Sequence, residues 1–137
     1  MSDEDGKEDS SSFAIVRDEF RTVLGKKFQR AVLIETNAHE GPVYVAAEHA
    51  LFFTTVPEPG PQNLAIMRLA LRGDKFPFEA EQLEIVRQPS NMANGMCLDR
   101  KGQLLICEQG TLDQRARISR MILKTHALES VVDQWRG

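Results

Sequence analysis

Two short segments of the chain place a polar residue directly before a glycine and an apolar run. Glu40 stands before Gly41, and Asn94 stands before Gly95 at the equivalent point of a later segment. An ionised carboxylate such as that of Glu40 is a hard oxygen ligand that Ca²⁺, Mg²⁺, Mn²⁺ or Zn²⁺ accepts. Judged by residue type alone, Glu40 is a solvent-facing strand residue beside a turn at Gly41-Pro42. Asn94-Gly95 is typical of a tight hairpin turn. The chemistry of both positions therefore depends on the elements that hold them.

These two segments belong to an internal repeat whose units keep the same order. Short β-rich runs alternate with turn residues from Ala31 onward, as in small antiparallel strands. Four pairs of runs match: 40–44 with 94–98, 50–53 with 103–106, 66–69 with 118–121, and 83–86 with 129–132. The spacing shrinks in the last pair because the loop beginning at Gly73 is longer than its counterpart after Lys124.

Each unit of the repeat therefore predicts four strands in about 45 to 55 residues, which is the size of a β-propeller blade. An all-β sandwich of about eight strands fits the strand count equally well, but it does not predict a repeat. Chance similarity between short apolar runs is the remaining alternative. Turn residues support the division, because prolines and a glycine interrupt the first unit at 57–61 and the segment 99–102 suits a hairpin. We expect an all-β fold.

The chain before the repeat has a different composition. Its first twelve residues carry five acidic side chains against one lysine and lack the apolar run of a secretory signal. They predict a disordered acidic tail at 1–12. Residues 13–38 form an N-terminal segment leading into the repeat, and apolar side chains at every fourth position indicate a turn of helix over 18–27.

Composition bounds the partners and the compartment. The formal net charge is −3, and outside the acidic tail the body is nearly neutral, without the clustered basic surface that nucleic acids or anionic membranes require. No apolar stretch approaches the length of about eighteen residues that a membrane span needs. Cys97 and Cys107 lie in apolar runs, where free cysteine packs as a small hydrophobe, and two cysteines indicate neither a disulfide framework nor a zinc site. We expect a cytoplasmic protein without nucleic-acid or membrane partners.

The residues of both units resemble a known family. The run His39–Tyr44 followed by Leu51–Phe53 is similar to the first-blade motif of the gluconolactonase, regucalcin (senescence marker protein) and luciferin-regenerating-enzyme family. A later set of residues resembles the second blade of the same family, namely Asn94-Gly95, Asp99, Gly102, Leu104, Cys107–Gly110, Ile118 and Arg120. The resemblance covers about residues 20–137. Gln109 stands where many members have a histidine, so no role of that histidine is carried over.

The family's members are six-bladed β-propellers that hold one divalent metal in the central channel and hydrolyse lactones or related esters. The resemblance implies a first blade at 39–90 and a second at 91–137. Glu40 falls on the first-blade glutamate that ligates the metal, and Asn94 on the second-blade asparagine that binds substrate. Equivalent residues of successive blades approach the same axis, which supports this pairing. The implied cofactor is Ca²⁺, Zn²⁺, Mg²⁺ or Mn²⁺, the implied ligand is a small-molecule lactone, and no catalytic residue is assigned.

The resemblance also implies what two blades lack. The family's other metal ligands, an asparagine and an aspartate, come from the third and fourth blades, and the chain ends at Gly137, where the third would begin. One carboxylate does not retain a divalent ion, because coordination needs several preorganised oxygens. We therefore expect the N-terminal part of a lactone hydrolase, inactive alone. The alternative is a non-catalytic propeller fragment or interaction module, with self-association through uncovered blade faces.

Overall fold

The computed structural model describes three stretches of the chain, residues 17–24, 34–75 and 77–134. The chain divides into two compact units, Met1–Val32 and Leu33–Gly137. The acidic tail expected at 1–12 lies outside the described residues. Within the three stretches, no helix is long and apolar enough to cross a membrane.

In the first unit, the predicted turn of helix is confirmed over residues 18–24, and the rest of the expected range, 25–27, lies outside the described residues. A 3₁₀ turn at Asp18–Phe20 (η2) passes into one turn of α-helix at Arg21–Leu24 (α1). Two acidic residues occupy the first turn, where the partial positive charge of a helix N-terminus favours them. The hydroxyl of Thr22 donates to the carbonyl oxygen of Glu19 over 2.6 Å.

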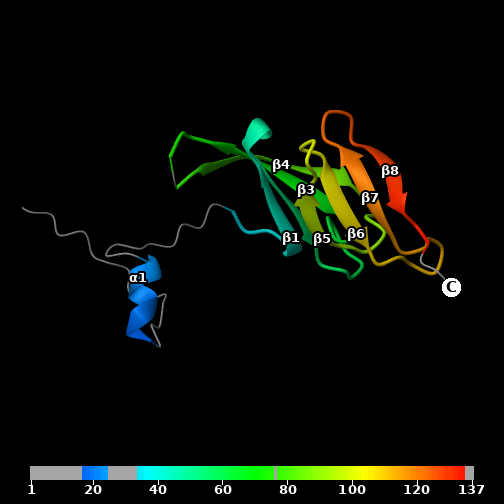
Figure 1. Ribbon diagram of the computed structural model, residues 1–137, viewed down its shortest axis with the longest axis horizontal. Helices are drawn as coiled ribbons and strands as arrows, with labels where there is room; N and C mark the ends of the chain where they lie inside the picture. The colour runs from blue at the N-terminus through cyan, green and yellow to red at the C-terminus, as the bar shows by residue number, and fades with distance from the viewer. Residues whose placement is uncertain (1–16, 25–33, 76, 135–137) are drawn as a thin grey trace, which may run out of the picture. The chain divides into compact units, whose positions relative to one another are not determined.

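The second unit holds eight strands in two four-stranded antiparallel sheets (Figure 1). The first sheet contains β1 (Ala38–Val45), β2 (Ala50–Thr55), β3 (Ile66–Arg72) and β4 (Glu79–Arg87). The second sheet contains β5 (Ala93–Leu98), β6 (Leu104–Glu108), β7 (Arg117–Ile122) and β8 (Ala127–Val132). In each sheet the strands pair in chain order, so each sheet is a meander. The all-β prediction is confirmed for this unit, and each of the eight predicted runs overlaps an observed strand.

The turn expected at 99–102 is present between β5 and β6. The Gly102 N–H donates to the carbonyl oxygen of Asp99 over 3.0 Å. The Asp99 carboxylate accepts the backbone N–H groups of Lys101 and Gln103 at 2.8 and 2.9 Å. These backbone hydrogen bonds lower the pKa of Asp99, and an acidic residue is favoured here because its side chain satisfies the turn's own donors.

The two sheets share one apolar core. Strict alternation along β2 and β6 turns one set of side chains toward the other sheet. The core consists of Val45, Ala50, Phe52 and Ile66 from the first sheet, with Leu104, Ile106 and Met121 from the second. Phe52 is fully buried there. Burial of one such aromatic side chain stabilises the packing of the sheets by about 2 kcal/mol.

The first sheet is also covered on its other face. A second cluster of buried side chains lies there, formed by Phe53, Ala65, Met67, Leu69 and Leu71. Phe78 and Leu83 pack against this cluster from the connection to β4 and from β4 itself. The middle strands β2 and β3 are therefore buried on both sides.

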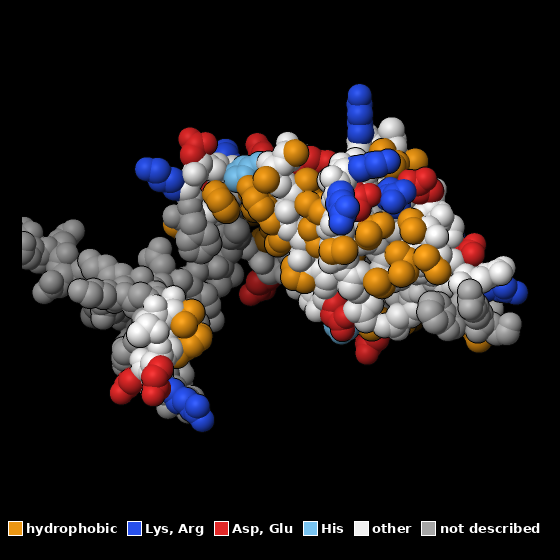
Figure 2. All heavy atoms as spheres, in the orientation of Figure 1, with side chains coloured by type: hydrophobic (Ala, Val, Ile, Leu, Met, Phe, Trp, Pro, Cys, Tyr) orange, Lys and Arg blue, Asp and Glu red, His pale blue; other side chains and the backbone are white. Residues whose placement is uncertain are grey.

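The second sheet is covered on one face only. Along β6 the side chains of Leu104, Ile106 and Glu108 are buried, whereas Cys107 between them is exposed. Cys97 on β5 is exposed as well, and hydrophobic side chains gather over this sheet in Figure 2. The expectation that both cysteines pack in a core is wrong, because the described residues provide no layer over their face of the sheet.

A row of side chains on this open face repeats a row of the first sheet. The two rows are Phe52, Arg68 and Glu84 across β2, β3 and β4, and Leu105, Arg120 and Glu129 across β6, β7 and β8. Arg68 donates to Glu84 over 3.0 Å, and Arg120 donates to Glu129 over 2.9 Å. The row of Phe52 faces the second sheet, so the row of Leu105 marks the equivalent face of the second sheet.

Candidate functional site

Glu40 lies on β1, the edge strand of the first sheet nearest to the second. Its backbone is opposite Thr54, whose hydroxyl donates to the Glu40 carbonyl oxygen over 2.8 Å. The Glu40 side chain is 43% exposed, and one of its carboxylate oxygens lies 3.7 Å from the Nδ1 atom of His39. The backbone of Glu40 is therefore fixed, while its carboxylate remains accessible to a ligand or a metal ion.

Gly41 brings this strand into direct contact with the second sheet. The pairing of β1 with β2 is irregular on either side of Glu40, and Gly41 has a φ of +61°, so the turn expected at Gly41-Pro42 is a bulge within the strand. A Cβ atom at Gly41 would overlap the carbonyl oxygen of Asn94 and lie 3.1 Å from the backbone nitrogen of Met96. Only glycine allows this approach of β1 to β5.

Asn94 lies inside β5 rather than in a hairpin turn. The strand runs from Ala93 to Leu98, and its pairing with β6 is irregular between Ala93 and Met96. Asn94 is half-buried in this irregular stretch. The structure thus brings together the backbones that carry Glu40 and Asn94, at the same end of adjacent strands of the two sheets.

The described residues do not complete a metal site. Among them, no group of three or more His, Cys, Asp or Glu side chains could hold a metal ion. Glu40 supplies one carboxylate, which is a suitable ligand for the hard cations expected from the sequence but is insufficient alone.

A buried carboxylate, that of Glu108, organises this end of the second sheet. The side chain of Glu108 is fully buried, and Arg87 donates to its two oxygens over 2.8 and 3.2 Å. Arg117 donates from Nε over 2.9 Å, Asn91 from its amide over 2.8 Å and Ser119 from its hydroxyl over 2.5 Å. Arg87 belongs to β4, so the network fastens the first sheet to the second.

The environment of Glu108 keeps it ionised. Burial alone raises the pKa of a carboxyl group, but the hydrogen bonds from Arg87, Ser119 and Asn91 outweigh burial and lower the pKa of Glu108 to about 2. A signal for this role was present in the sequence. Glu108 continues the alternation of Leu104 and Ile106 and therefore faces the core, where a carboxylate requires partners.

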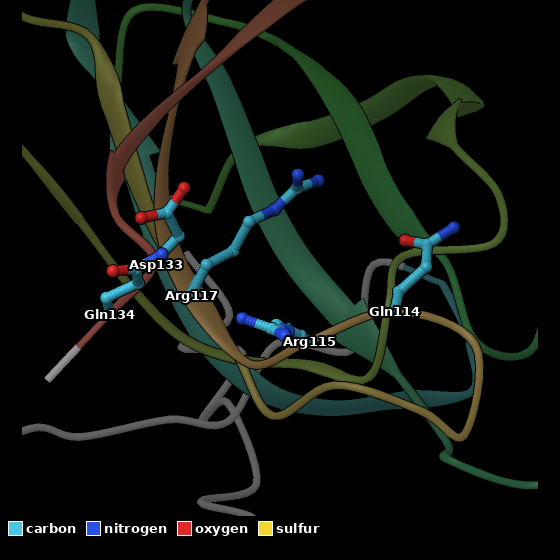
Figure 3. Close-up of a pocket in the computed structure, with 5 residues that line it drawn as sticks. All are labelled: Gln114, Arg115, Arg117, Asp133 and Gln134. Atoms are coloured by element: carbon cyan, nitrogen blue, oxygen red, sulfur yellow. The ribbon is translucent and has the colours of Figure 1, made fainter. Parts of the chain in front are cut away.

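A pocket opens at the same end of the second sheet, on the edge away from Asn94. Its cavity volume is about 410 Å³, and it is lined by Gln114, Arg115, Arg117, Asp133 and Gln134. In Figure 3, Asp133 and Gln134 stand on one side of the pocket, Gln114 stands on the other, and the two arginines lie between them. This pocket was not expected from the sequence, because the β6–β7 connection and the end of β8 meet only in the folded sheet.

One solved structure is similar to this chain at the level of both sequence and fold. It is an X-ray structure of a candidate gluconolactonase, 30% identical with a TM-score of 0.53. The match covers 72% of this chain and 28% of that protein. No protein-family model and no curated protein matches the chain.

The similarity supports the family resemblance at a distant level. The fold is similar over the matched region, and in this chain it consists of two four-stranded antiparallel sheets. The chain spans about a quarter of the length of the structure it matches, namely 28%. The number of blades, the metal and the activity are therefore matters for proposal.

Proposed function

We propose that this chain supplies one wall of the active site of a metal-dependent lactone hydrolase of the gluconolactonase type. In this proposal, residues 39–90 and 91–137 are the first two blades of a six-bladed propeller, Glu40 is one metal ligand and Asn94 is a substrate contact. The observation that carries it is the contact of Gly41 with the backbone of Asn94. This contact brings equivalent positions of the two repeats close together, as is required if successive blades approach a common axis.

The chemistry of the two side chains suits these roles. Glu40 offers an accessible anionic oxygen to Ca²⁺, Zn²⁺, Mg²⁺ or Mn²⁺, and the remaining ligands would come from further blades. The amide of Asn94 can both donate to and accept from the oxygens of a lactone. Because one carboxylate does not hold a divalent ion, the chain alone is expected to be inactive.

A chimera tests this proposal. Residues 34–134 would replace the matched segment of the solved gluconolactonase-type protein, and hydrolysis of glucono-δ-lactone would be measured with and without divalent metal, with the parent protein as reference. We expect metal-dependent hydrolysis that Glu40→Gln lowers by more than about 100-fold, since loss of even an outer-shell partner costs about 10- to 100-fold. Asn94→Ala should raise KM by roughly tenfold through loss of one hydrogen bond.

The matched control is His39→Gln, which alters the neighbouring side chain and leaves the carboxylate in place. It should retain the activity of the unsubstituted chimera. A folded chimera whose hydrolysis is unaffected by Glu40→Gln would contradict the role of Glu40 as a ligand.

One observation favours a second candidate, an interaction module without catalysis. The open face of the second sheet repeats the face by which the first sheet binds its neighbour, and Ile118 on it is 38% exposed. We propose that copies of the chain associate through this face. Light scattering should then show a mass that rises with concentration, and Ile118→Asp should reduce it.

The control for association is Leu112→Asp, because Leu112 is fully exposed in the β6–β7 connection, away from the strands. Alkylation of Cys97 and Cys107 should slow in the associated form. A monomer with freely reactive cysteines at every concentration would rule this candidate out.

A further inference from the structure

The pocket at the far edge of the second sheet lies apart from Glu40 and Asn94. Glu108 pairs with Ala93 on one side and Arg117 on the other, and Ile118 pairs with Val132 directly before Asp133. The pocket therefore sits at the same end of the sheet as Asn94 but on the opposite edge. Three strand spacings separate these edges, or about 14 Å.

The side chain of one pocket arginine, Arg117, is held by a buried carboxylate. The Nε atom of Arg117 donates to the buried Glu108 over 2.9 Å, and Glu108 is fixed in turn by Arg87, Asn91 and Ser119. The two terminal nitrogens of Arg117 form no hydrogen bond or ion pair with residues of the described stretches. A guanidinium anchored through Nε presents its remaining N–H groups in a fixed plane, which suits a carboxylate.

The second arginine stands on a loop that is also fixed. The backbone carbonyl of Arg115 accepts from the amide of the buried Asn91 over 3.1 Å. The Thr111 N–H donates to the Gln114 carbonyl over 2.7 Å, and the Gln114 N–H donates to the Thr111 hydroxyl over 3.1 Å. These bonds close the loop, so that only the exposed side chain of Arg115 needs to be ordered by a ligand.

A carboxylate faces the same cavity without pairing with either arginine. Asp133 lines the pocket together with Arg115 and Arg117, yet no ion pair joins it to any residue in 17–24, 34–75 or 77–134. Opposite charges that line one cavity but do not meet leave room for a molecule between them. Such a molecule would present an anionic group to the arginines and hydroxyl donors to Asp133.

We propose that this pocket binds a small hydroxycarboxylate anion, such as a sugar acid. Its carboxylate would accept hydrogen bonds from Arg115 and Arg117, and its hydroxyl groups would donate to Asp133. The amides of Gln114 and Gln134 can donate to and accept from the remaining hydroxyl groups. A volume of about 410 Å³ is within the usual range for small-molecule sites. The proposal rests on the pocket alone and does not require the lactone hydrolase.

Titration of the ¹⁵N-labelled full chain with sodium gluconate tests the proposal by NMR. We expect saturable shifts of the backbone amides at 114–117 and 133–134, and weaker binding as salt screens the charges. Arg115→Ala should weaken binding roughly 10- to 100-fold, the usual effect of removing a hydrogen bond to a charged group. Arg115→Lys, which keeps the charge but loses the planar donors, should lie between Arg115→Ala and the natural chain.

Asp133→Asn separates a hydroxycarboxylate site from a general anion site. It should weaken gluconate binding while strengthening binding of inorganic phosphate, because a hydroxyl acceptor is replaced and a negative charge is removed. Arg100→Ala, in the hairpin at the opposite end of the sheet, should change neither. Glu40→Gln in the chain should not affect gluconate binding, even if the same substitution abolishes hydrolysis in the chimera. Absence of saturable gluconate binding would overturn the proposal. So would binding that is insensitive to Arg115→Ala, or phosphate binding as tight as gluconate binding, which would indicate an adventitious ion only.

Discussion

The two sheets have the same strand order and the same repeat, but they differ in what covers them. In the first sheet, β2 and β3 are buried on both faces. In the second sheet, buried and open positions alternate along β6 and β7, and every residue of β8 is exposed. Similar sequence patterns therefore have different energetic consequences, because an apolar side chain stabilises the fold only where another layer meets it.

The test of this comparison with the largest expected effect uses the equivalent residues Phe52 and Leu105. Phe52→Ala should lower the free energy of unfolding by about 4 kcal/mol, since it leaves a cavity between the sheets. Leu105→Ala should cost about 1 kcal/mol, because its side chain is only half-buried on the open face. Urea denaturation followed by circular dichroism gives both values. Equal losses would show that the open face is covered in solution.

The second test concerns the charge that only the second sheet buries. Ala38 pairs with Thr55 in the first sheet as Ala93 pairs with Glu108 in the second. Thr55 is neutral and uses its hydroxyl to accept the Ala65 N–H over 2.9 Å, whereas Glu108 binds two arginines. The pH dependence of stability should therefore arise largely from Glu108.

The sign of this dependence follows from the lowered pKa. The pKa of Glu108 falls from 4.5 to about 2 in the folded chain, so its contribution is present above pH 4.5 and is lost as the pH falls toward 2. A shift of this size corresponds to about 3 kcal/mol. Glu108→Gln should lower stability at pH 7 by a similar amount and flatten the loss between pH 5 and about 2. If the Glu108→Gln chain lost the same stability between pH 5 and about 2 as the natural chain, a group other than Glu108 would be responsible for that loss.

The comparison also shows what sequence reasoning could reach. Period-two runs and their repetition predicted all eight strands, because alternation and turn residues are local properties. The burial of Cys97 and Cys107, in contrast, does not follow from the local sequence. Alternation assigns them to one face, but only the arrangement of layers decides whether that face meets another sheet.

The candidate site divides in the same way. Glu40 and Asn94 were found because they occupy equivalent points of the repeat. The partners of Glu108 and the arginine pocket were missed, since Arg87, Asn91 and Arg117 converge from β4, the β4–β5 connection and β7. Pro42 was expected to mark a turn, yet β1 is an edge strand, where proline removes no required ladder hydrogen bond.

The smallest of the three effects compares the glycines that follow Glu40 and Asn94. Gly41→Ala should cost about 2 kcal/mol, because alanine is strained at a φ of +61° and its Cβ would meet the Asn94 carbonyl oxygen. Gly95 has open space where a Cβ would be added, so Gly95→Ala should change stability by less than about 0.5 kcal/mol. Thermal unfolding of both variants against the natural chain measures the difference.

This pair of glycines also separates folding from function. Since Gly41 sets the distance between the strands that carry Glu40 and Asn94, Gly41→Ala should lower lactone hydrolysis in the chimera more than its loss of stability explains. Gly95→Ala should leave hydrolysis near that of the unsubstituted chimera. If Gly41→Ala were as active and as stable as Gly95→Ala, the close approach of β1 to β5 would have no part in positioning a site. The asymmetry between the sheets would then concern packing alone.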